Sequence, residues 1–202
     1  EVLDQERLYR TIEQASREIH PECKPGPILD EVIRSLYDGI APDEIEQAMI
    51  MAARSRIEIE PAYSYVAARL LLKKIYKEVL QKNVHLESRE TALREHFTRY
   101  VHQGVSLDRL SPELLDFDLD KLATVMCIER DHTFNYMGLQ TLYDRYLIHI
   151  EERRIESPQY FWMRVSMGLS INEGAQKNER AIEFYHTLST FRFISSTPTL
   201  FN

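Results

Sequence analysis

The sequence predicts an all-α protein with one short β-hairpin near residues 146–156. Apolar residues recur at i, i+3, i+4 and i+7 in most segments, which is the spacing of an amphipathic helix. Proline and glycine fall between those segments, where helices begin and end. The chain has 202 residues, of which 44% are hydrophobic and 10% aromatic, so a buried core is expected.

The first predicted helix covers Gln5 to Ile19 and ends at the breaker-rich run from His20 to Pro27. A second helix covers Ile28 to Tyr37. Pro42 fits the first turn of a third helix, since a proline there removes no helical hydrogen bond. One apolar stripe faces the core from this third helix: Ile45, Ala48, Met49, Ala52 and Ala53.

Pro61 opens a fourth helix, whose lysines are expected to point outward. A fifth covers Glu87 to His102 and is expected to end at Gly104, because glycine is favoured just past a helix. The buried face predicted for the fourth helix consists of Tyr65, Ala68, Leu72, Ile75, Tyr76 and Val79.

Two Ser-Pro pairs, at Ser111 and Ser157, each predict a helix that begins with a serine cap and a proline in the first turn. Residues Tyr146 to Ile150 are strand-like and Glu151 to Arg154 turn-like, which predicts the hairpin. The last helix is expected over Asn178 to Thr190, with Ala181, Ile182, Tyr185 and Leu188 inward.

Charge and cysteine content exclude several classes of function. The net charge of -7, without a basic stripe, argues against nucleic-acid binding. No apolar run approaches the ~18 residues of a membrane span. Cys23, in an exposed-looking loop, and Cys127, in an apolar run, are too few for a disulfide framework or a zinc knuckle. We expect two inert thiols in a cytoplasmic protein.

The six glycines are isolated, so the two glycine-rich phosphate-binding motifs are absent, although nucleotide binding by other means stays open. Glu-x-x-His occurs twice, at Glu129/His132 and Glu183/His186. On a helix this spacing can hold a metal pair in a ferritin-like bundle, which also needs a glutamate from two further helices. Nothing marks those glutamates, so we expect no metal site and assign the pairs to surface or capping roles.

Hydroxyl side chains gather around Pro198, in the order Ser195, Ser196, Thr197 and Thr199. Hydroxyls and free N–H groups in an irregular segment can form a nest for an anionic oxygen. The alternative is a turn whose hydroxyls cap the neighbouring backbone. The residues alone leave both interpretations open.

Several long segments resemble the N-terminal portion of the large (alpha, catalytic) subunit of class I ribonucleotide reductase, in that family's order and spacing. The resemblance covers nearly the whole chain, and it rests on L-Y-D-G-I (36–40), Y-S-Y-V-A-A-R-L-L-L (63–72), D-H-T-F-N-Y-M-G-L-Q-T-L-Y-D-R-Y-L (131–147), P-Q-Y-F-W-M-R-V-S-M-G-L (158–169), E-R-A-I-E-F-Y-H-T-L-S-T-F (179–191) and R-F-I-S-S-T-P-T-L-F-N (192–202). Vitamin-B12-dependent relatives share T-P-T-L-F-N, whereas the 131–147 run favours class I.

The resemblance implies part of an enzyme that reduces ribonucleoside diphosphates to deoxyribonucleotides. The family's ten-stranded α/β barrel, which carries the catalytic cysteines, would follow residue 202, so we expect no turnover from this chain alone. Leu200 and Phe201 are then expected to await the rest of the core. The implied partners are the barrel half, a small subunit that holds the radical cofactor, a thioredoxin- or glutaredoxin-type reductant and a second large subunit. No cofactor is expected on this chain itself.

Thr199 matches the family position that binds the phosphate end of the substrate, through its hydroxyl and its backbone N–H. The resemblance therefore favours the anion-binding interpretation for Thr199, whereas Ser195 and Ser196 are expected to be structural.

Residues 1–82 resemble the helical part of an ATP-cone, through which ATP activates and dATP inhibits, and residues 83–202 would form the helical domain. Arg7 and Lys77 align with basic contacts to the nucleotide. Pro42 and Glu46 depart from the family pattern, and Glu46 would repel a triphosphate, so a degenerate or cut cone is expected. An alternative is a non-catalytic regulatory module that keeps only the cone-like surface.

Overall fold

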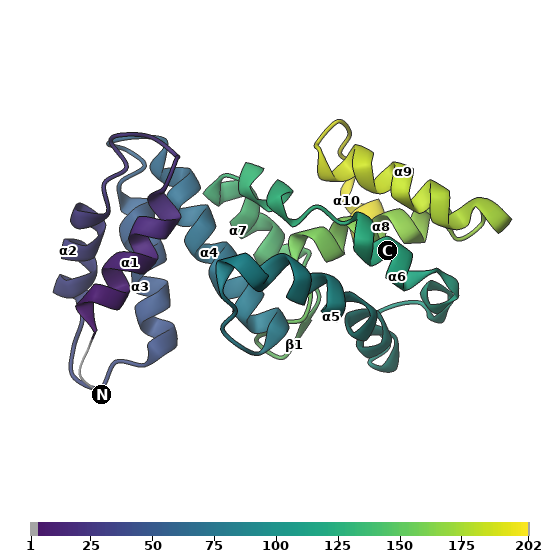
Figure 1. Ribbon diagram of the computed structural model, residues 1–202, viewed down its shortest axis with the longest axis horizontal. Coiled ribbons are helices and arrows are strands. Elements are labelled where there is room, and N and C mark those ends of the chain that lie inside the picture. Colours follow the sequence, from purple (N-terminus) through teal and green to yellow (C-terminus); the bar gives the residue numbers. More distant parts are fainter. Residues whose placement is uncertain (1–3, 202) are drawn as a thin grey trace. The chain divides into compact units, whose positions relative to one another are not determined.

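A computed structural model describes residues 4–201 of the chain, without the side chains of residues 86 and 201. It confirms the predicted fold class, because the described part is mainly helical with one short pair of antiparallel strands (Figure 1). The contacts divide the chain into two compact units. Unit 1 comprises Glu1–Lys74 and His132–Thr141, and unit 2 comprises Ile75–Asp131 and Leu142–Asn202.

The elements follow in a simple order along the chain. The α-helices are α1 Gln5–Ser16, α2 Pro25–Ser35, α3 Pro42–Ser55, α4 Tyr63–Leu80, α5 Leu86–Ser106, α6 Leu119–Val125, α7 Tyr136–Arg145, α8 Pro158–Ser170, α9 Lys177–Ser189 and α10 Thr197–Phe201. The 3-10 helices are η1 Pro112–Asp116, η2 Ile128–Thr133 and η3 Gly174–Gln176, and the strands are β1 His149–Ile150 and β2 Arg153–Arg154.

In unit 1, α2 packs against both α1 and α3 (Figure 1). Each helix buries an apolar stripe, and burial of these side chains stabilises the unit by roughly 25 cal/mol per Å² of apolar surface. The innermost members, almost wholly excluded from solvent, are Ile12, Ile28, Val32, Ile50, Ala53, Val66 and Ala67.

Local chemistry at the helix starts explains where the elements begin. Asp4 caps α1, since its carboxylate accepts a hydrogen bond from the backbone N–H of Arg7 at 3.0 Å. Pro42 begins α3, where Glu44 accepts the N–H of Ala41 at 2.8 Å. At α8 the hydroxyl of Ser157 accepts the N–H of Tyr160, and a proline follows the cap as predicted.

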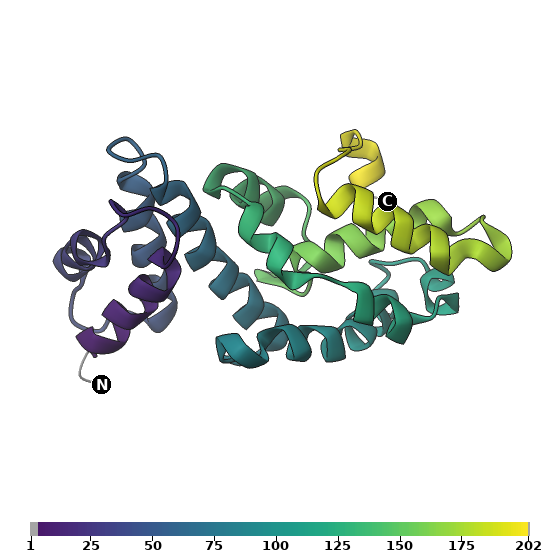
Figure 2. The same ribbon diagram turned by 45° about the horizontal axis from the view of Figure 1, so that its top comes forward.

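In unit 2, α8 and α9 pack along each other, and α5 contacts α6 and η1 (Figure 2). The core between α5 and α8 is aromatic: the rings of Tyr100 and Tyr160 lie 4.9 Å apart, and Phe97 meets Tyr160 edge-on at 5.3 Å. Such pairs add roughly 0.5–1.5 kcal/mol each to the effect of burial alone. The α8 helix is therefore the central element of this unit, and nearly all its side chains are buried.

The predicted hairpin is confirmed, although it is shorter than the pattern indicated. His149 pairs with Arg154 and Ile150 with Arg153 in an antiparallel register. Glu151 turns the chain with a positive φ of 52°. Arg153 and Arg154, expected in the turn, form the second strand instead.

Four local predictions were wrong. The α5 helix continues through Gly104, because the small glycine lets the side chain of Leu110 pack against its backbone. Pro25 opens α2 inside the expected loop. Tyr65 is 42% exposed, whereas the other five residues of the predicted face of α4 are buried, and Tyr63 and Val66 are buried with them. Cys23, expected in an exposed loop, is only 4% exposed.

The burial of Cys23 has a long-range cause. The hydroxyl of Tyr63 donates to the carbonyl of Glu22 at 3.0 Å and accepts the N–H of Lys24 at 3.1 Å, so it holds the loop against α4. Desolvation, followed by the charges of Glu60 and Glu22, raises the pKa of the Cys23 thiol. Among the residues that the structure describes, no helix is both long and apolar enough to cross a membrane.

Candidate functional site

The hydroxyl cluster predicted from the sequence lies on and just before α10. Thr199 is half-buried in the middle of this helix, and its N–H donates to the carbonyl of Ser196 at 3.1 Å. Within the described part of the chain, the hydroxyl of Thr199 makes no hydrogen bond. The hydroxyl, rather than the N–H that the sequence analysis also invoked, is the group left to meet a ligand.

The other hydroxyls of the cluster differ in their surroundings. The Oγ1 atom of Thr197 lies 3.3 Å from the phenol oxygen of Tyr146. The Oγ atom of Ser195 is buried and has no hydrogen-bond partner among the described residues. Ser196 is exposed and contributes its carbonyl to Thr199. The cluster is thus not a closed set of capping hydroxyls.

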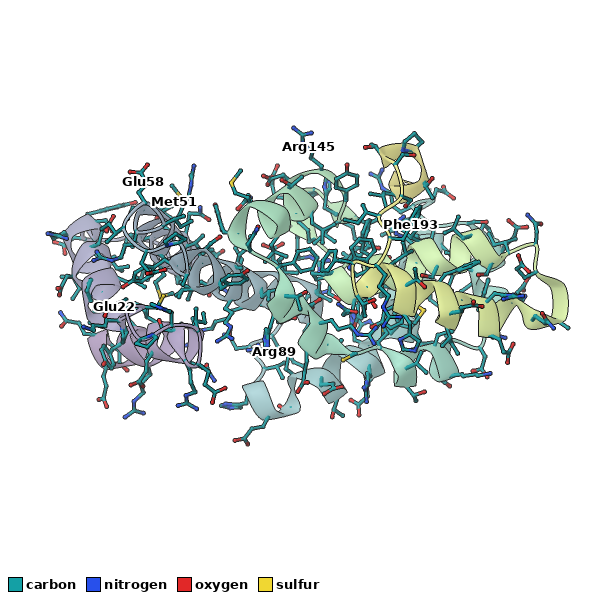
Figure 3. The ribbon with its side chains drawn as sticks, turned by 90° about the horizontal axis from the view of Figure 1, so that it is seen from above. Glu22, Met51, Glu58, Arg89, Arg145 and Phe193 are labelled. Carbon is teal, nitrogen blue, oxygen red and sulfur yellow. The ribbon has the colours of Figure 1, made fainter. Side chains whose placement is uncertain are left out.

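Leu200 corrects the expectation that the last apolar residues await a further core. It is 7% exposed, since α10 packs against α8 within unit 2. The side chain of Phe201 lies outside the described residues. Phe193, in the segment that joins α9 to α10, is exposed and projects from the ribbon (Figure 3).

Beneath α10 lies a buried ion pair between Arg164 of α8 and Glu156, the residue before the cap of that helix. The Nε atom of Arg164 donates to Glu156 Oε1 at 2.7 Å, and the Nη2 atom reaches Oε2 at 3.4 Å. Neither residue has more than 4% exposure. The same Nη2 donates to the backbone carbonyl of Leu200 at 3.4 Å, so the ion pair contacts α10 directly.

Further donors saturate the Glu156 carboxylate. The hydroxyl of Tyr100 donates to Oε1, and the N–H of Ile148 donates to Oε2 at 3.0 Å. Burial alone would lower the pKa of Arg164, but the adjacent Glu156 carboxylate and Tyr100 outweigh it and leave that pKa raised. The guanidinium therefore stays charged inside the core.

A second buried carboxylate, Asp131, lies in the same unit. It accepts the hydroxyl of Tyr76 at 2.5 Å and the amide nitrogen of Gln159 at 2.6 Å. The amide oxygen of Gln159 in turn accepts the hydroxyl of Tyr185 at 2.5 Å, and that hydroxyl accepts the N–H of Cys127 at 2.8 Å. This chain of bonds ties α4, η2, α8 and α9 together.

Burial raises the pKa of Asp131 to about 7, although the two hydrogen bonds from Tyr76 and Gln159 act in the opposite direction. Its two hydrogen-bond donors are neutral side chains, whereas Glu156 is paired with the Arg164 guanidinium. The group is fully enclosed, so it tunes the stability of the unit and offers no surface to a substrate.

The two basic residues aligned with nucleotide contacts belong to different units. Arg7 lies on α1 in unit 1 with its side chain exposed, and Lys77 lies on α4 in unit 2 and is half-buried. Pro42 is exposed at the start of α3, and Glu46 is half-buried on the same helix. All four residues lie on the helices in which the sequence analysis placed them. Their joint role in binding a nucleotide stays a prediction.

Neither of the two Glu-x-x-His motifs lies in surroundings that suit the binding of two metal ions. Glu129 and His132 lie in the 3-10 helix η2, whose spacing differs from that of an α-helix. Glu183 accepts a hydrogen bond from Arg180 at 2.6 Å, and His186 Nδ1 lies 3.1 Å from Arg130. Among the described residues, no three His, Cys, Asp or Glu side chains are grouped so that they could hold a metal ion.

The sequence analysis missed Arg164 and Glu156. A signal was present, because Arg164 stands inside the apolar run from Tyr160 to Met167, on a helix with apolar residues on every face. An arginine in such a place is seldom buried without a carboxylate partner. Identifying Glu156 as that partner needs the fold of the hairpin.

Comparisons with known proteins agree with this architecture. Residues 132–202 match the family model described as "Ribonucleotide reductase, all-alpha domain". The chain is 51% identical over 184 residues, 90% of its length, to the ribonucleoside-diphosphate reductase subunit alpha of Chlamydia trachomatis. It is 38% identical over 82% of its length to the corresponding subunit of Helicobacter pylori, and 30% identical over 98% to the large subunit of Plasmodium falciparum.

The matched part is a small share of each relative. It spans 17% of the Chlamydia trachomatis protein, 20% of the Helicobacter pylori protein and 24% of the Plasmodium falciparum protein. The chain therefore corresponds to about a fifth of the length of these relatives.

Proposed function

We propose, on the premise that the chain belongs to the family of ribonucleotide reductase large subunits, that it forms part of a catalytic subunit that reduces ribonucleoside diphosphates. Its own share of the function would be the helical scaffold and one group of the substrate-phosphate site. The observation that carries this role is the placement of the Thr199 hydroxyl, which is half-buried on an anchored helix and makes no hydrogen bond within the described chain.

The chemistry of the Thr199 hydroxyl suits a phosphate oxygen. A hydroxyl donates one hydrogen bond, and a bond to a charged acceptor contributes roughly 1.5–3 kcal/mol. Because the N–H of Thr199 is already paired with Ser196, the contact would be made by the side chain alone. The substrate class is a nucleoside diphosphate, and the hydroxyl would bind its phosphate end.

The partners of the subunit are part of the same proposal. The barrel half would supply the catalytic cysteines, a separate small subunit the radical cofactor, and a thioredoxin- or glutaredoxin-type protein the electrons. We expect the large subunit to act as a homodimer in the cytoplasm, with ATP and dATP as its effectors, although the cone-like residues 1–82 are by themselves expected to be degenerate or cut. Arg7 and Lys77 are the basic residues of that region that align with nucleotide contacts of the family's cone.

The test is reconstitution of the reaction. The chain is combined with a barrel half, a radical-generating small subunit, a reductant and CDP, and the product dCDP is measured. We expect turnover with the chain present and none without it. Continued inactivity with a barrel half that is active beside a relative's own N-terminal portion would refute the proposal.

The role of Thr199 is tested separately with Thr199→Val. Removing the hydroxyl should raise KM for CDP by about 10- to 100-fold, as expected for the loss of a bond to a charged group. Thr190→Val is the matched control, because this hydroxyl, at the C-cap of α9, donates only to backbone carbonyls of its own helix, those of His186 and Thr187. An equal KM in both variants would remove Thr199 from the site.

A further inference from the structure

The helix that carries Thr199 is too short to hold itself in place. It has five residues, and a helix of that length is unstable in water without tertiary contacts. Its orientation must therefore come from its anchors. Within the described part of the chain these include the buried side chain of Leu200, the Tyr146–Thr197 contact and the bond from Arg164 to the carbonyl of Leu200.

The three anchors differ in what they can fix. The side chain of Leu200 supplies burial, which is non-directional. Thr197 is exposed, so water competes for its contact with Tyr146. The Arg164 bond is buried, charged and directed at the carbonyl of Leu200, the residue after Thr199, so it defines the rotation of the helix.

The position of Arg164 is itself fixed from several elements. Glu156 holds its Nε atom, while Tyr100 of α5 and the N–H of Ile148 hold Glu156. The guanidinium is planar and its donors form a rigid fork, so fixing one edge fixes the direction of the remaining donors. The carbonyl of Leu200 thus meets a donor whose place is set by the core of unit 2.

Stability alone does not account for this arrangement. Replacing a buried ion pair by apolar residues is often neutral or stabilising, since the desolvation of two charges opposes their attraction. What an apolar pair cannot supply is a directed donor to the carbonyl of Leu200. The ion pair therefore serves to fix the orientation of α10.

We propose that Arg164 is a positioning residue, which holds the carbonyl of Leu200 and thereby orients the hydroxyl of Thr199 toward the substrate's phosphate. Glu156 keeps the guanidinium in the required orientation. The part of the inference that concerns phosphate rests on the proposed function, whereas the part that concerns the order of α10 does not.

The test uses Arg164→Lys in the 202-residue chain. Lysine keeps the charge for Glu156, but its single nitrogen lacks the fork that reaches both Glu156 and Leu200. Arg94→Lys is the matched control, because Arg94 also pairs with a glutamate, Glu90, and donates to a backbone carbonyl, that of Met126. It makes these contacts from α5, and neither of them involves α10.

The first readout is hydrogen exchange of the Thr199 amide, followed by NMR without any ligand. We expect exchange about tenfold faster or more in Arg164→Lys, and within about twofold of the parent in Arg94→Lys. Unchanged exchange in Arg164→Lys would overturn the proposal. Should that variant fail to fold, Tyr100→Phe loosens Glu156 more mildly and must still accelerate the exchange.

The second readout is the KM for CDP in the reconstituted enzyme. Arg164→Lys should raise KM about tenfold with kcat changed less than about threefold, and adding it to Thr199→Val should change KM little further. Fully additive effects would mean that Arg164 does not act through Thr199. An unchanged KM in Thr199→Val would instead remove Thr199 from the phosphate site, while the exchange readout would still decide whether Arg164 orders α10.

Discussion

Tyr76 donates a 2.5 Å hydrogen bond to Asp131 in the interior of unit 2, where the carboxyl is wholly excluded from solvent. Gln159 donates to the other carboxyl oxygen, and the guanidinium of Arg89 lies over the Tyr76 ring at 5.1 Å. Burial raises the pKa of Asp131 to about 7, so a structural carboxyl titrates close to neutral pH.

The stability of the chain should therefore depend on the titration of Asp131. Its folded pKa lies above the unfolded value, so its contribution is complete below about pH 4 and is lost as the pH rises through about 7. We expect the free energy of unfolding to fall by on the order of 2–3 kcal/mol between pH 5 and pH 8 from this group alone. Urea denaturation at the two pH values measures it.

Asp131→Asn isolates the effect from other titrating groups. Asparagine has an acceptor oxygen and a donating NH2 group where the protonated carboxyl has an acceptor oxygen and a donating O–H, and it does not titrate. The free energy of unfolding of the variant should not show this fall between pH 5 and pH 8. Relative to the parent, the variant should therefore become more stable as the pH rises over that range. A constant difference would show that Asp131 does not change its protonation in that range.

Gly104 provides a test of close packing in α5. A Cβ atom there would lie 2.5 Å from Cδ1 and 2.7 Å from Cγ of Leu110, whose N–H is bonded to the Gly104 carbonyl. Gly104→Ala should destabilise the chain by about 1–3 kcal/mol through overpacking, although alanine is normally better than glycine inside a helix by about 1 kcal/mol. Thermal or urea denaturation shows whether Gly104→Ala lowers or raises the stability of the chain.

Two further variants identify the cause. In Gly26→Ala the new methyl group meets no atom within 4 Å, so this control should be neutral or slightly stabilising. In a Leu110→Ala background the clash is removed, and Gly104→Ala should then cease to destabilise. If it still destabilised there, the backbone at Gly104 rather than Leu110 would be responsible.

Much of the fold was predictable because its signals are local. The proline at the start of α3, the Ser157 cap of α8 and the hairpin turn near Glu151 depend on residues within a few positions of one another. Gly104 misled the prediction, because a glycine past a helix and a glycine packed inside one have the same sequence signal. Its contact with Leu110 is a tertiary one.

The site was predictable only in part, for the same reason. Thr199 could be singled out from its segment and the family resemblance, but its anchor could not. Arg164 lies 36 positions from Leu200, and Glu156 lies 56 positions from Tyr100, so both relationships require the folded chain. The burial of Cys23 likewise depends on Tyr63, 39 to 41 positions from the groups that it bonds.

The ion pair of Glu156 and Arg164 yields a prediction about coupled stability. Arg164→Met leaves a buried carboxylate without its cation, and Glu156→Leu leaves a buried guanidinium without its anion, so each should destabilise the chain by about 3–5 kcal/mol. The double variant removes both charges, and its loss of stability should be smaller than the sum of the single losses by at least about 2 kcal/mol. Urea denaturation of the four proteins measures the coupling.

The double variant also separates stability from the order of α10. The hydroxyl of Tyr100 and the carbonyl of Leu200 lose their buried partners, so adding Tyr100→Phe should recover part of the remaining loss. Exchange of the Thr199 amide should stay fast in this triple variant, because no donor to the carbonyl of Leu200 is restored. Slow, parent-like exchange in a stable triple variant would mean that apolar packing of Leu200 is enough to hold α10, and that the charge of Arg164 serves only its partner Glu156.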